Sequence, residues 1–229
     1  ETSTGFIDLS GQCFSYEFSS GEEKKLCDLY DIMKLHPELD PTGFKLTWYL
    51  GNFQWSYNSK ILNFFAMLYH NGRVIRDLCA INHDGTNLHI VISSEETQRY
   101  PVDGRKRKFG HLFPAGSILQ NHQAILPGDK QIMICGQETF ILPPGKTPDP
   151  RDAFIGARLL LLADINGSRL QLIQGDDHDF DGHPSSNPQG TLWLGSNHNY
   201  FVKILNPLTT HVTNIFSLEK NNCNHGALN

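Results

Sequence analysis

The sequence predicts a mainly β protein, specifically an antiparallel β-sandwich of jelly-roll type with an N-terminal helix. Three observations lead to this fold class: about ten short β-rich runs, frequent glycine, proline and asparagine between them, and one amphipathic helical pattern. Short strands separated by turn residues are typical of two packed antiparallel sheets. We expect a single domain over residues 1–229, with an N-terminal arm and helix at 1–40 and a β-sandwich at 41–229.

The helical pattern lies in the segment GEEKKLCDLYDIMKL, and we expect a helix over residues 22–35. Its apolar residues have the i, i+3, i+4, i+7 spacing of one helix face: Leu26, Leu29, Tyr30 and Met33. Ser20 and Glu23 are spaced for a capping box, and His36-Pro37 ends the pattern. The apolar stripe is expected to cover the protein's own core, with a subunit contact as the alternative.

The predicted strands follow in three series with hairpin turns between them. Asn71-Gly72, Asp84-Gly85 and Asn166-Gly167 are typical two-residue turns. No segment repeats at a fixed period. The expected strands are FKLTWYL, KILNFFAMLYH, RVIRDLCAI and LHIVIS, then SILQNHQAIL, KQIMICGQETFIL, ARLLLLADI and RLQLIQG, and finally TLWLG, YFVKILN and HVTNIFSL.

Charge, hydropathy and cysteine content limit the classes of function. A net charge of -5 gives no general attraction to nucleic acid or to an anionic membrane. No stretch approaches the roughly 20 apolar residues of a membrane span, and we expect a soluble, unsecreted chain without a membrane partner. The five cysteines are odd in number and form no C-x-x-C pair, so reduced and packed thiols are expected.

The segment GDDHDFDGH, residues 175–183, is the densest group of potential metal ligands. Asp177, Asp179, Asp181 and Gly182 reproduce the opening D-x-D-x-D-G of a calcium loop. The twelfth position of that loop requires a bidentate glutamate, and here it is Pro188. A calcium site at the three aspartates is therefore the weaker alternative to a solvated acidic turn.

A second charged segment carries four successive cations: Arg105, Lys106, Arg107 and Lys108. These side chains are suited to holding phosphate groups by charge-assisted hydrogen bonds. The pattern leaves two readings open, a contact with a polyanion or another subunit, and an exposed charged loop.

No pattern of catalytic residues is evident. Gly145-Lys146-Thr147 resembles the end of a P-loop, but Phe140 stands where the first glycine is required. The eleven histidines show no H-x-x-x-H spacing on a helix, although distant strands can assemble a three-ligand metal site. No G-x-S-x-G elbow or G-x-G-x-x-G segment is present. Nothing in the sequence requires an enzyme or a cofactor.

The last quarter of the chain, DGHPSSNPQGTLWLGSNHNYFVKIL followed by NNCNHGALN, resembles the C-terminal part of the cypovirus polyhedrins, which form intracellular crystals around insect reoviruses. The similar elements are Pro184-Ser185-Ser186, the Gly195-Ser196-x-His198-Asn199 block before an apolar strand, and the Asn/His-rich end. Gly104 to Phe109 resembles a second block of that family, and FFAMLYHNGRVI resembles a strand pair more loosely. The resemblance covers roughly residues 60–229 and rests on the common order of these pieces.

The resemblance implies a jelly-roll sandwich with a projecting helix, in trimers that pack into a crystal lattice around virus particles. It further implies occlusion bodies in the cytoplasm of infected insect cells, nucleoside triphosphates bound in the lattice, and dissolution at alkaline pH. The run Arg105–Lys108 would then be the candidate nucleotide-binding site. Two features depart from the family: GDDHDFDGH has no clear counterpart, and the chain has only seven tyrosines.

The sequence thus predicts a non-enzymatic structural protein, a polyhedrin that assembles into viral occlusion bodies. One alternative is a β-sandwich binding module of lectin-like or capsid-like type, with calcium at the acidic loop. The other is a metal-dependent enzyme whose histidines converge inside the fold.

Overall fold

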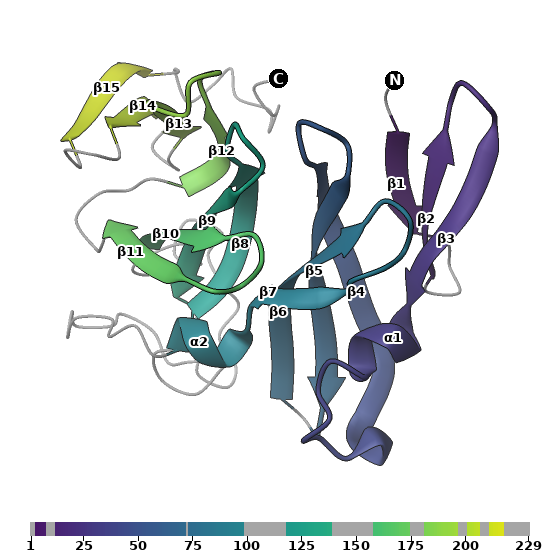
Figure 1. The fold of residues 1–229 in the computed structure, drawn as a ribbon. Coiled ribbons are helices and arrows are strands. Elements are labelled where there is room, and N and C mark those ends of the chain that lie inside the picture. Colours follow the sequence, from purple (N-terminus) through teal and green to yellow (C-terminus); the bar gives the residue numbers. More distant parts are fainter. Residues whose placement is uncertain are drawn as a thin grey trace. The chain divides into compact units, whose positions relative to one another are not determined.

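The computed structural model describes residues 3–7, 12–71, 73–98, 118–138, 158–174, 181–196, 201–206 and 211–217. These residues form antiparallel sheets with few helices (Figure 1), which confirms the mainly β character predicted from the sequence. The chain divides into two compact units. The first holds Glu1–Ser93 and Asp164–Ser168, and the second holds Ser94–Ala163 and Arg169–Asn229. The single-domain expectation is not tested by this division and stays a prediction.

The first sheet of unit 1 contains β1 (Ser3–Ile7), β2 (Gln12–Glu17) and β3 (Glu22–Asp28) in that order. The helix α1 (Leu29–Met33) follows β3 directly, and a 3-10 turn, η1 (Pro41–Gly43), precedes the next strand. Three strands therefore lie within the segment expected to be an arm and a helix.

The predicted helix over residues 22–35 is wrong for its first seven residues, which form β3. Pairing with β2 outweighs the helical spacing, and a register shift next to Cys13 turns Leu26 and Cys27 both inward. Two adjacent buried residues in a bulged strand imitate part of a helical stripe. The capping box is formed by Asp28 and Asp31, not by Ser20 and Glu23.

The second sheet of unit 1 contains four strands in chain order. Three of its strands agree within one residue with the predicted runs KILNFFAMLYH, RVIRDLCAI and LHIVIS, and the last two are joined at the predicted Asp84-Gly85 hairpin. The first strand continues five residues beyond the predicted run FKLTWYL. The strands are β4 (Phe44–Trp55), β5 (Ile61–His70), β6 (Arg73–Asn82) and β7 (His89–Ile92).

Unit 2 holds the helix α2 (Ser94–Gln98) and two further four-stranded sheets, again each in chain order. The first contains β8 (Ile118–Ile125), β9 (Gln131–Glu138), β10 (Arg158–Asp164) and β11 (Leu170–Gln174). The second contains β12 (Asp181–Ser186), β13 (Trp193–Ser196), β14 (Phe201–Asn206) and β15 (His211–Ser217).

The strand β12 was not expected, because its sequence DGHPSS contains Gly182 and Pro184. It lies at the edge of its sheet, where proline's missing N–H is tolerated. Its pairing with β13 is irregular, since the register shifts between Asp181 and Ser185. β-strand propensity therefore did not predict β12, because an edge strand with a bulge tolerates glycine and proline.

The sheet topology does not confirm a jelly roll. That fold contains Greek keys, in which strands far apart in the chain pair with each other. In all four described sheets, each strand pairs only with its neighbour in the sequence. Four-stranded meanders of this kind are the building blocks of β-propellers.

A hairpin turn of one geometry joins the first two strands of every four-stranded sheet. The turns are Ser56–Ile61, Leu126–Gln131 and Asn187–Leu192. In each turn the first N–H donates to the last carbonyl at 2.8 to 3.0 Å, and the fourth N–H donates to the first carbonyl at 2.9 to 3.1 Å. The fourth residue has positive φ in all three turns: Ser59, Asp129 and Gly190. The sequence shows no fixed period at these turns because they are unequally spaced along the chain.

A second recurring turn joins the last two strands of two sheets. Gly85 donates to the Asn82 carbonyl and Gly167 donates to the Asp164 carbonyl, both at 2.9 Å. Both glycines have positive φ and pack against the outer strand of another sheet within unit 1. A Cβ on Gly85 would lie 3.3 Å from the Leu26 carbonyl oxygen, and one on Gly167 would lie 3.0 Å from that of Ile90.

Each unit has its own hydrophobic core between two sheets. In unit 1, the inner faces of β5 and β6 meet α1 and residues of β2 and β3, including Cys13, Leu26 and Ile32. In unit 2, Trp193 and Leu205 meet Met133 and other residues of the β8–β11 sheet. Fully burying large apolar side chains contributes about 1.5 to 3 kcal/mol each, so these faces hold each pair of sheets together.

The recurring glycine turns give a graded prediction for three Gly→Ala variants. Gly128 has φ +93° with no atom within 4 Å of its added Cβ, so its substitution costs only the unfavourable backbone, about 1 kcal/mol. Gly85→Ala is expected to destabilise more, and Gly167→Ala most, because each Cβ also meets a backbone carbonyl. Urea denaturation of the three variants measures the order, and equal losses would show that the two packed turns are loosely held.

Candidate functional site

Two buried ionisable side chains of unit 1, His36 and Asp77, lie in contact. The His36 Nε2 is 2.8 Å from Asp77 Oδ2, and its Nδ1 is 3.4 Å from Glu38 Oε1. Only 8% of His36 and 1% of Asp77 is exposed, whereas Glu38 is largely in solvent. Buried charges are strongly disfavoured unless paired, so this pair is the first candidate for a functional or structural centre.

The end of α1 sets the position of His36. After Met33 the chain leaves the helix through two turn hydrogen bonds, Leu35 N–H to the Ile32 carbonyl and His36 N–H to the Met33 carbonyl, both 3.0 Å long. The helix itself is fixed by its buried residues Leu29 and Ile32. Packing of α1 thereby holds the imidazole against the sheet.

Strand alternation sets the position of Asp77. It lies on β6 opposite Ala66 of β5, two residues from Cys79. Successive side chains of a strand point to opposite faces, so Asp77 and Cys79 share a face. Cys79 belongs to the core of unit 1, and the carboxylate therefore stands on an apolar surface.

The segment between His36 and β4 is held at a second place, on the β5–β6 hairpin. The His70 Nε2 lies 2.9 Å from the Asp40 carbonyl oxygen, and Asn71 N–H donates to the Gly43 carbonyl at 2.9 Å. A Cβ on Gly43 would meet the ends of the His70 and Asn71 side chains at under 3 Å, so these side chains would have to shift to admit it. Phe44 packs against the His70 ring.

Electrostatics favours a protonated His36. Burial lowers the pKa of His36, but the Asp77 carboxylate and, to a smaller extent, Glu38 outweigh it, so the pKa is raised above its ordinary value of 6.5. The short contact lies off the direction of the ring N–H, which makes it a charge contact more than a linear hydrogen bond. The Asp77 carboxylate thus favours the charged form of the buried His36 ring.

The surrounding thiols are not activated. Burial first, and Asp77 second, raise the pKa of Cys79 well above its ordinary value. A catalytic cysteine needs a lowered pKa and access to substrate, whereas Cys79 is fully enclosed. His36, Asp77 and Cys79 therefore lack the properties of a nucleophilic triad, and the arrangement fits a structural clamp between the end of α1 and β6.

The structure places the sequence-predicted sites as follows. Arg105, Lys106, Arg107 and Lys108 lie outside the described residues, as do Asp177 and Asp179. Asp181 begins β12, where its backbone pairs with Ser196. Among the described residues, no three His, Cys, Asp or Glu side chains are grouped for a metal ion.

Four of the five cysteines are described, and all four are buried free thiols, as the sequence predicted: Cys13, Cys27, Cys79 and Cys135. Cys223 lies outside the described residues. None of the helices in the described part of the chain is long and apolar enough to cross a bilayer.

Comparison with known proteins gives similarity at the level of fold. No family model and no curated protein matches the chain. The chain is similar to a solved nidogen/laminin complex at 8% identity and a TM-score of 0.50, covering 90% of this chain and 57% of that one. It is also similar to a prolyl endopeptidase at 15% identity and a TM-score of 0.50. That match covers 95% of this chain and 29% of the endopeptidase chain.

An oligogalacturonate lyase from Vibrio parahaemolyticus matches at 12% identity and a TM-score of 0.41, with 94% of this chain and 62% of that chain covered. The chain thus spans less than two thirds of the length of each of these three structures. The two matches at 0.50 suggest a propeller-like fold, in agreement with the four-stranded meanders. These three proteins are not polyhedrins.

The His36–Asp77 pair is not evident in the sequence, because its two members are 41 positions apart and neither belongs to a motif. One signal was available. Asp77 interrupts the apolar run RVIRDLCAI of a predicted central strand, and aspartate is almost never fully buried unless it is paired. The sequence could therefore indicate that Asp77 needs a partner, but not which residue supplies it.

We expect His36→Gln to destabilise unit 1 by roughly 3 kcal/mol, because it removes the imidazole that lies 2.8 Å from a buried carboxylate. The double variant His36→Gln/Asp77→Asn should recover a large part of this loss, since no charge then remains to be paired. Urea unfolding of the two single variants and the double variant measures the coupling. Additive losses would contradict the clamp.

The raised pKa of His36 also predicts a pH dependence of stability. A raised folded-state pKa means that the pair stabilises fully below about pH 6.5, and this stabilisation is lost as the pH rises through the folded-state value. Unfolding measured from pH 5.5 to pH 9 should show this loss in the native protein and not in His36→Gln. The exposed His83→Gln is the control and should keep the native profile. An unchanged profile in His36→Gln would contradict the assignment.

Proposed function

We propose that the protein is a non-enzymatic module of propeller-type blades that works through its surface, as a structural or binding protein. The observation that carries this proposal is the recurrence of one hairpin geometry in three four-stranded meanders. Such sheets form rigid frameworks that present their connecting turns to other molecules.

The interior of unit 1 supports the non-enzymatic part. Its buried charges, His36 and Asp77, are directed at each other, and burial raises the pKa of its Cys79 thiol. A reactive group needs both a matched pKa and access to a substrate. Because His36 and Asp77 are both buried, we assign their contact a role in stabilising the fold.

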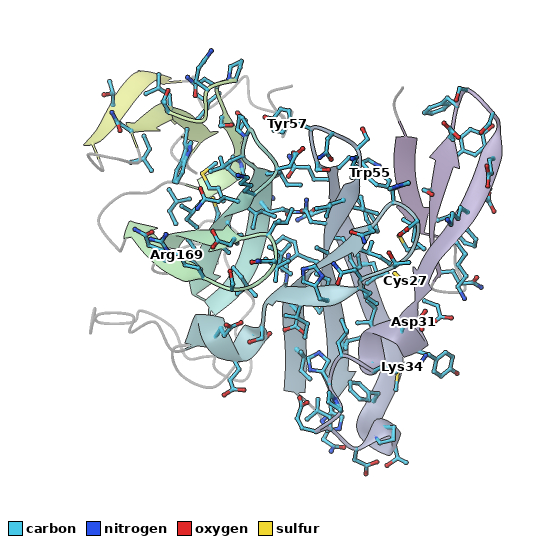
Figure 2. The ribbon with its side chains drawn as sticks, in the orientation of Figure 1. Cys27, Asp31, Lys34, Trp55, Tyr57 and Arg169 are labelled. Carbon is cyan, nitrogen blue, oxygen red and sulfur yellow. The ribbon has the colours of Figure 1, made fainter. Side chains whose placement is uncertain are left out.

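The exposed aromatic side chains support the surface role. Tyr57 lies on the first of the recurring turns (Figure 2). Its side chain is 62% exposed, and that of Phe18, at the tip of the β2–β3 hairpin, is 61% exposed. Aromatic residues are enriched at the centres of protein interfaces. Phe18 is further held edge-on by Tyr16, with ring centroids 5.4 Å apart.

Two narrower functions stay predictions. One is the polyhedrin reading, with a jelly-roll sandwich, trimers in a lattice around virus particles, nucleotides on Arg105–Lys108, and occlusion bodies in the insect-cell cytoplasm. The other is the lectin-like or capsid-like module with calcium at Asp177, Asp179 and Asp181. Both belong to the proposed surface-acting class, and the described residues test neither one.

Sedimentation of the purified protein at increasing concentration, joined to a turbidity titration from pH 7 to pH 11, tests the proposal. Concentration-dependent assembly would support a self-associating structural protein, and particles that dissolve cooperatively in alkali would support the occlusion-body function. The double variant Phe18→Ser/Tyr57→Ser should weaken assembly by at least tenfold while the protein still folds, because both side chains are largely exposed.

The opposite outcomes are equally defined. A protein that remains monomeric, unchanged by Phe18→Ser/Tyr57→Ser, would exclude self-assembly through these turns, and a rise in melting point with calcium would then favour the binding module. A stoichiometric transition metal in the purified protein, lost together with a measurable activity on chelation, would overturn the non-enzymatic class.

A further inference from the structure

Cys13 and Cys27 are directly opposite each other in the first sheet. Cys13 lies on β2 and Cys27 on β3, and the register pairs the two residues. Both are free and buried, with 0% and 2% of their surface exposed. Figure 2 labels Cys27 on its strand within unit 1.

A bulge brings the second thiol to this position. The register passes from Cys13 opposite Cys27 to Phe14 opposite Lys25, which leaves Leu26 as an extra residue on β3. Leu26 and Cys27 are consequently both buried, although a regular strand would turn one of them to solvent. The bulge therefore aims the Cys27 thiol at the core and at Cys13.

The backbone separation of such a pair is suitable for a disulfide. Directly opposed residues of antiparallel strands have Cα atoms about 4.5 or 5.5 Å apart, depending on the hydrogen-bonding pattern. Disulfides span Cα separations of about 4.4 to 6.8 Å. The two thiols already interact, since the hydrogen bond that the Cys27 thiol makes with Cys13 is the leading cause that raises the pKa of Cys27, followed by burial.

We propose that Cys13 and Cys27 are a redox site that forms a reversible cross-strand disulfide between β2 and β3. The oxidant is a small-molecule disulfide of the glutathione type. The Cys13 Sγ–Cys27 Sγ bond forms, the S–S bond of the small molecule breaks, and the two thiol protons leave with its two released thiols. A thiol reductant reverses each step.

Burial makes the reaction depend on opening of the sheet. The thiolate is the attacking species, and the raised pKa of Cys27 together with enclosure keeps the folded pair slow to react. Oxidation therefore proceeds during folding or when β2 and β3 separate locally. Once formed, the disulfide is shielded in the core and closes the loop over residues 13–27.

The other described thiols are matched controls. Cys79 and Cys135 are as deeply buried, but the residues opposite them are Phe64 and Ile90 for Cys79 and His122 for Cys135. None of these is a cysteine. Cys79 belongs to the same core cluster as Cys13 and Cys27, so Cys79→Ser also tests whether it competes for the disulfide. Cys223 is replaced by serine throughout the experiment, so that it does not compete for the oxidant.

The test is refolding of Cys223→Ser in oxidised and reduced glutathione, followed by alkylation and peptide mapping. We expect one disulfide that joins the peptides of Cys13 and Cys27, with Cys79 and Cys135 alkylated in full. Adding Cys79→Ser should leave the bond intact, and adding Cys27→Ser should abolish it. Full alkylation of Cys13 and Cys27 after refolding in excess oxidised glutathione, or glutathione adducts without the cross-link, would overturn the proposal.

A second readout compares the oxidised and the reduced form of the same protein, with both Cys13 and Cys27 in place. Closing a loop of about 15 residues restricts the unfolded chain, so oxidised Cys223→Ser should melt roughly 5 °C or more above its reduced form. Reductant added to the oxidised protein in mild urea should remove the shift, and Cys79→Ser should show the same shift. A melting point insensitive to reductant in a protein carrying the mapped bond would overturn its role as a staple of the sheet.

Discussion

The burial of Asp77 is the constraint on which much of unit 1 depends. Its carboxylate stands on the inner face of β6 among apolar side chains, where an unpaired charge would prevent folding. The requirement for His36 fixes where α1 ends and where the following segment runs. Because α1 follows β3 directly, the same contact also fixes the first sheet against the second. A single polar pair thus specifies an arrangement that apolar packing alone would leave less unique.

The sequence predicted the strands of the central meanders well and the first sheet poorly, for a physical reason. KILNFFAMLYH and ARLLLLADI are continuous apolar runs between turn residues, and local sequence is enough to identify them. β3 begins with four charged residues and becomes a strand only through pairing with β2. The bulge at Leu26 lets a strand bury two adjacent residues, and this burial pattern resembles part of a helical stripe. β12 likewise depends on its edge position, which no local pattern reveals.

The candidate site was beyond sequence reasoning for a related reason. Dense groups of charge, the aspartates of GDDHDFDGH and the run Arg105–Lys108, are visible in the sequence because their members are neighbours in the chain. The structure instead joins isolated residues, a histidine after a short helix and an aspartate inside an apolar strand. The cysteine pair has the same character. Cys13 and Cys27 show no motif spacing, and only the strand register brings them together.

The bulge at Leu26 links the first sheet to the recurring glycine turns. The Gly85 turn of β6–β7 packs on the Leu26 carbonyl, at the same place where the extra residue of β3 turns Cys27 toward Cys13. A regular strand would present a different carbonyl to that turn and would point Cys27 away from the core. The close contact between the Gly85 turn and β3 therefore depends on both the missing side chain at residue 85 and the extra residue in β3. The Gly167 turn meets β7 in the same way. The register there passes from Leu78 opposite Ile92 to Cys79 opposite Ile90, which leaves Val91 as an extra residue at the contact. Both glycine turns therefore pack on an outer strand at a bulge. The bulge at Leu26 has one further consequence, the alignment of the two thiols.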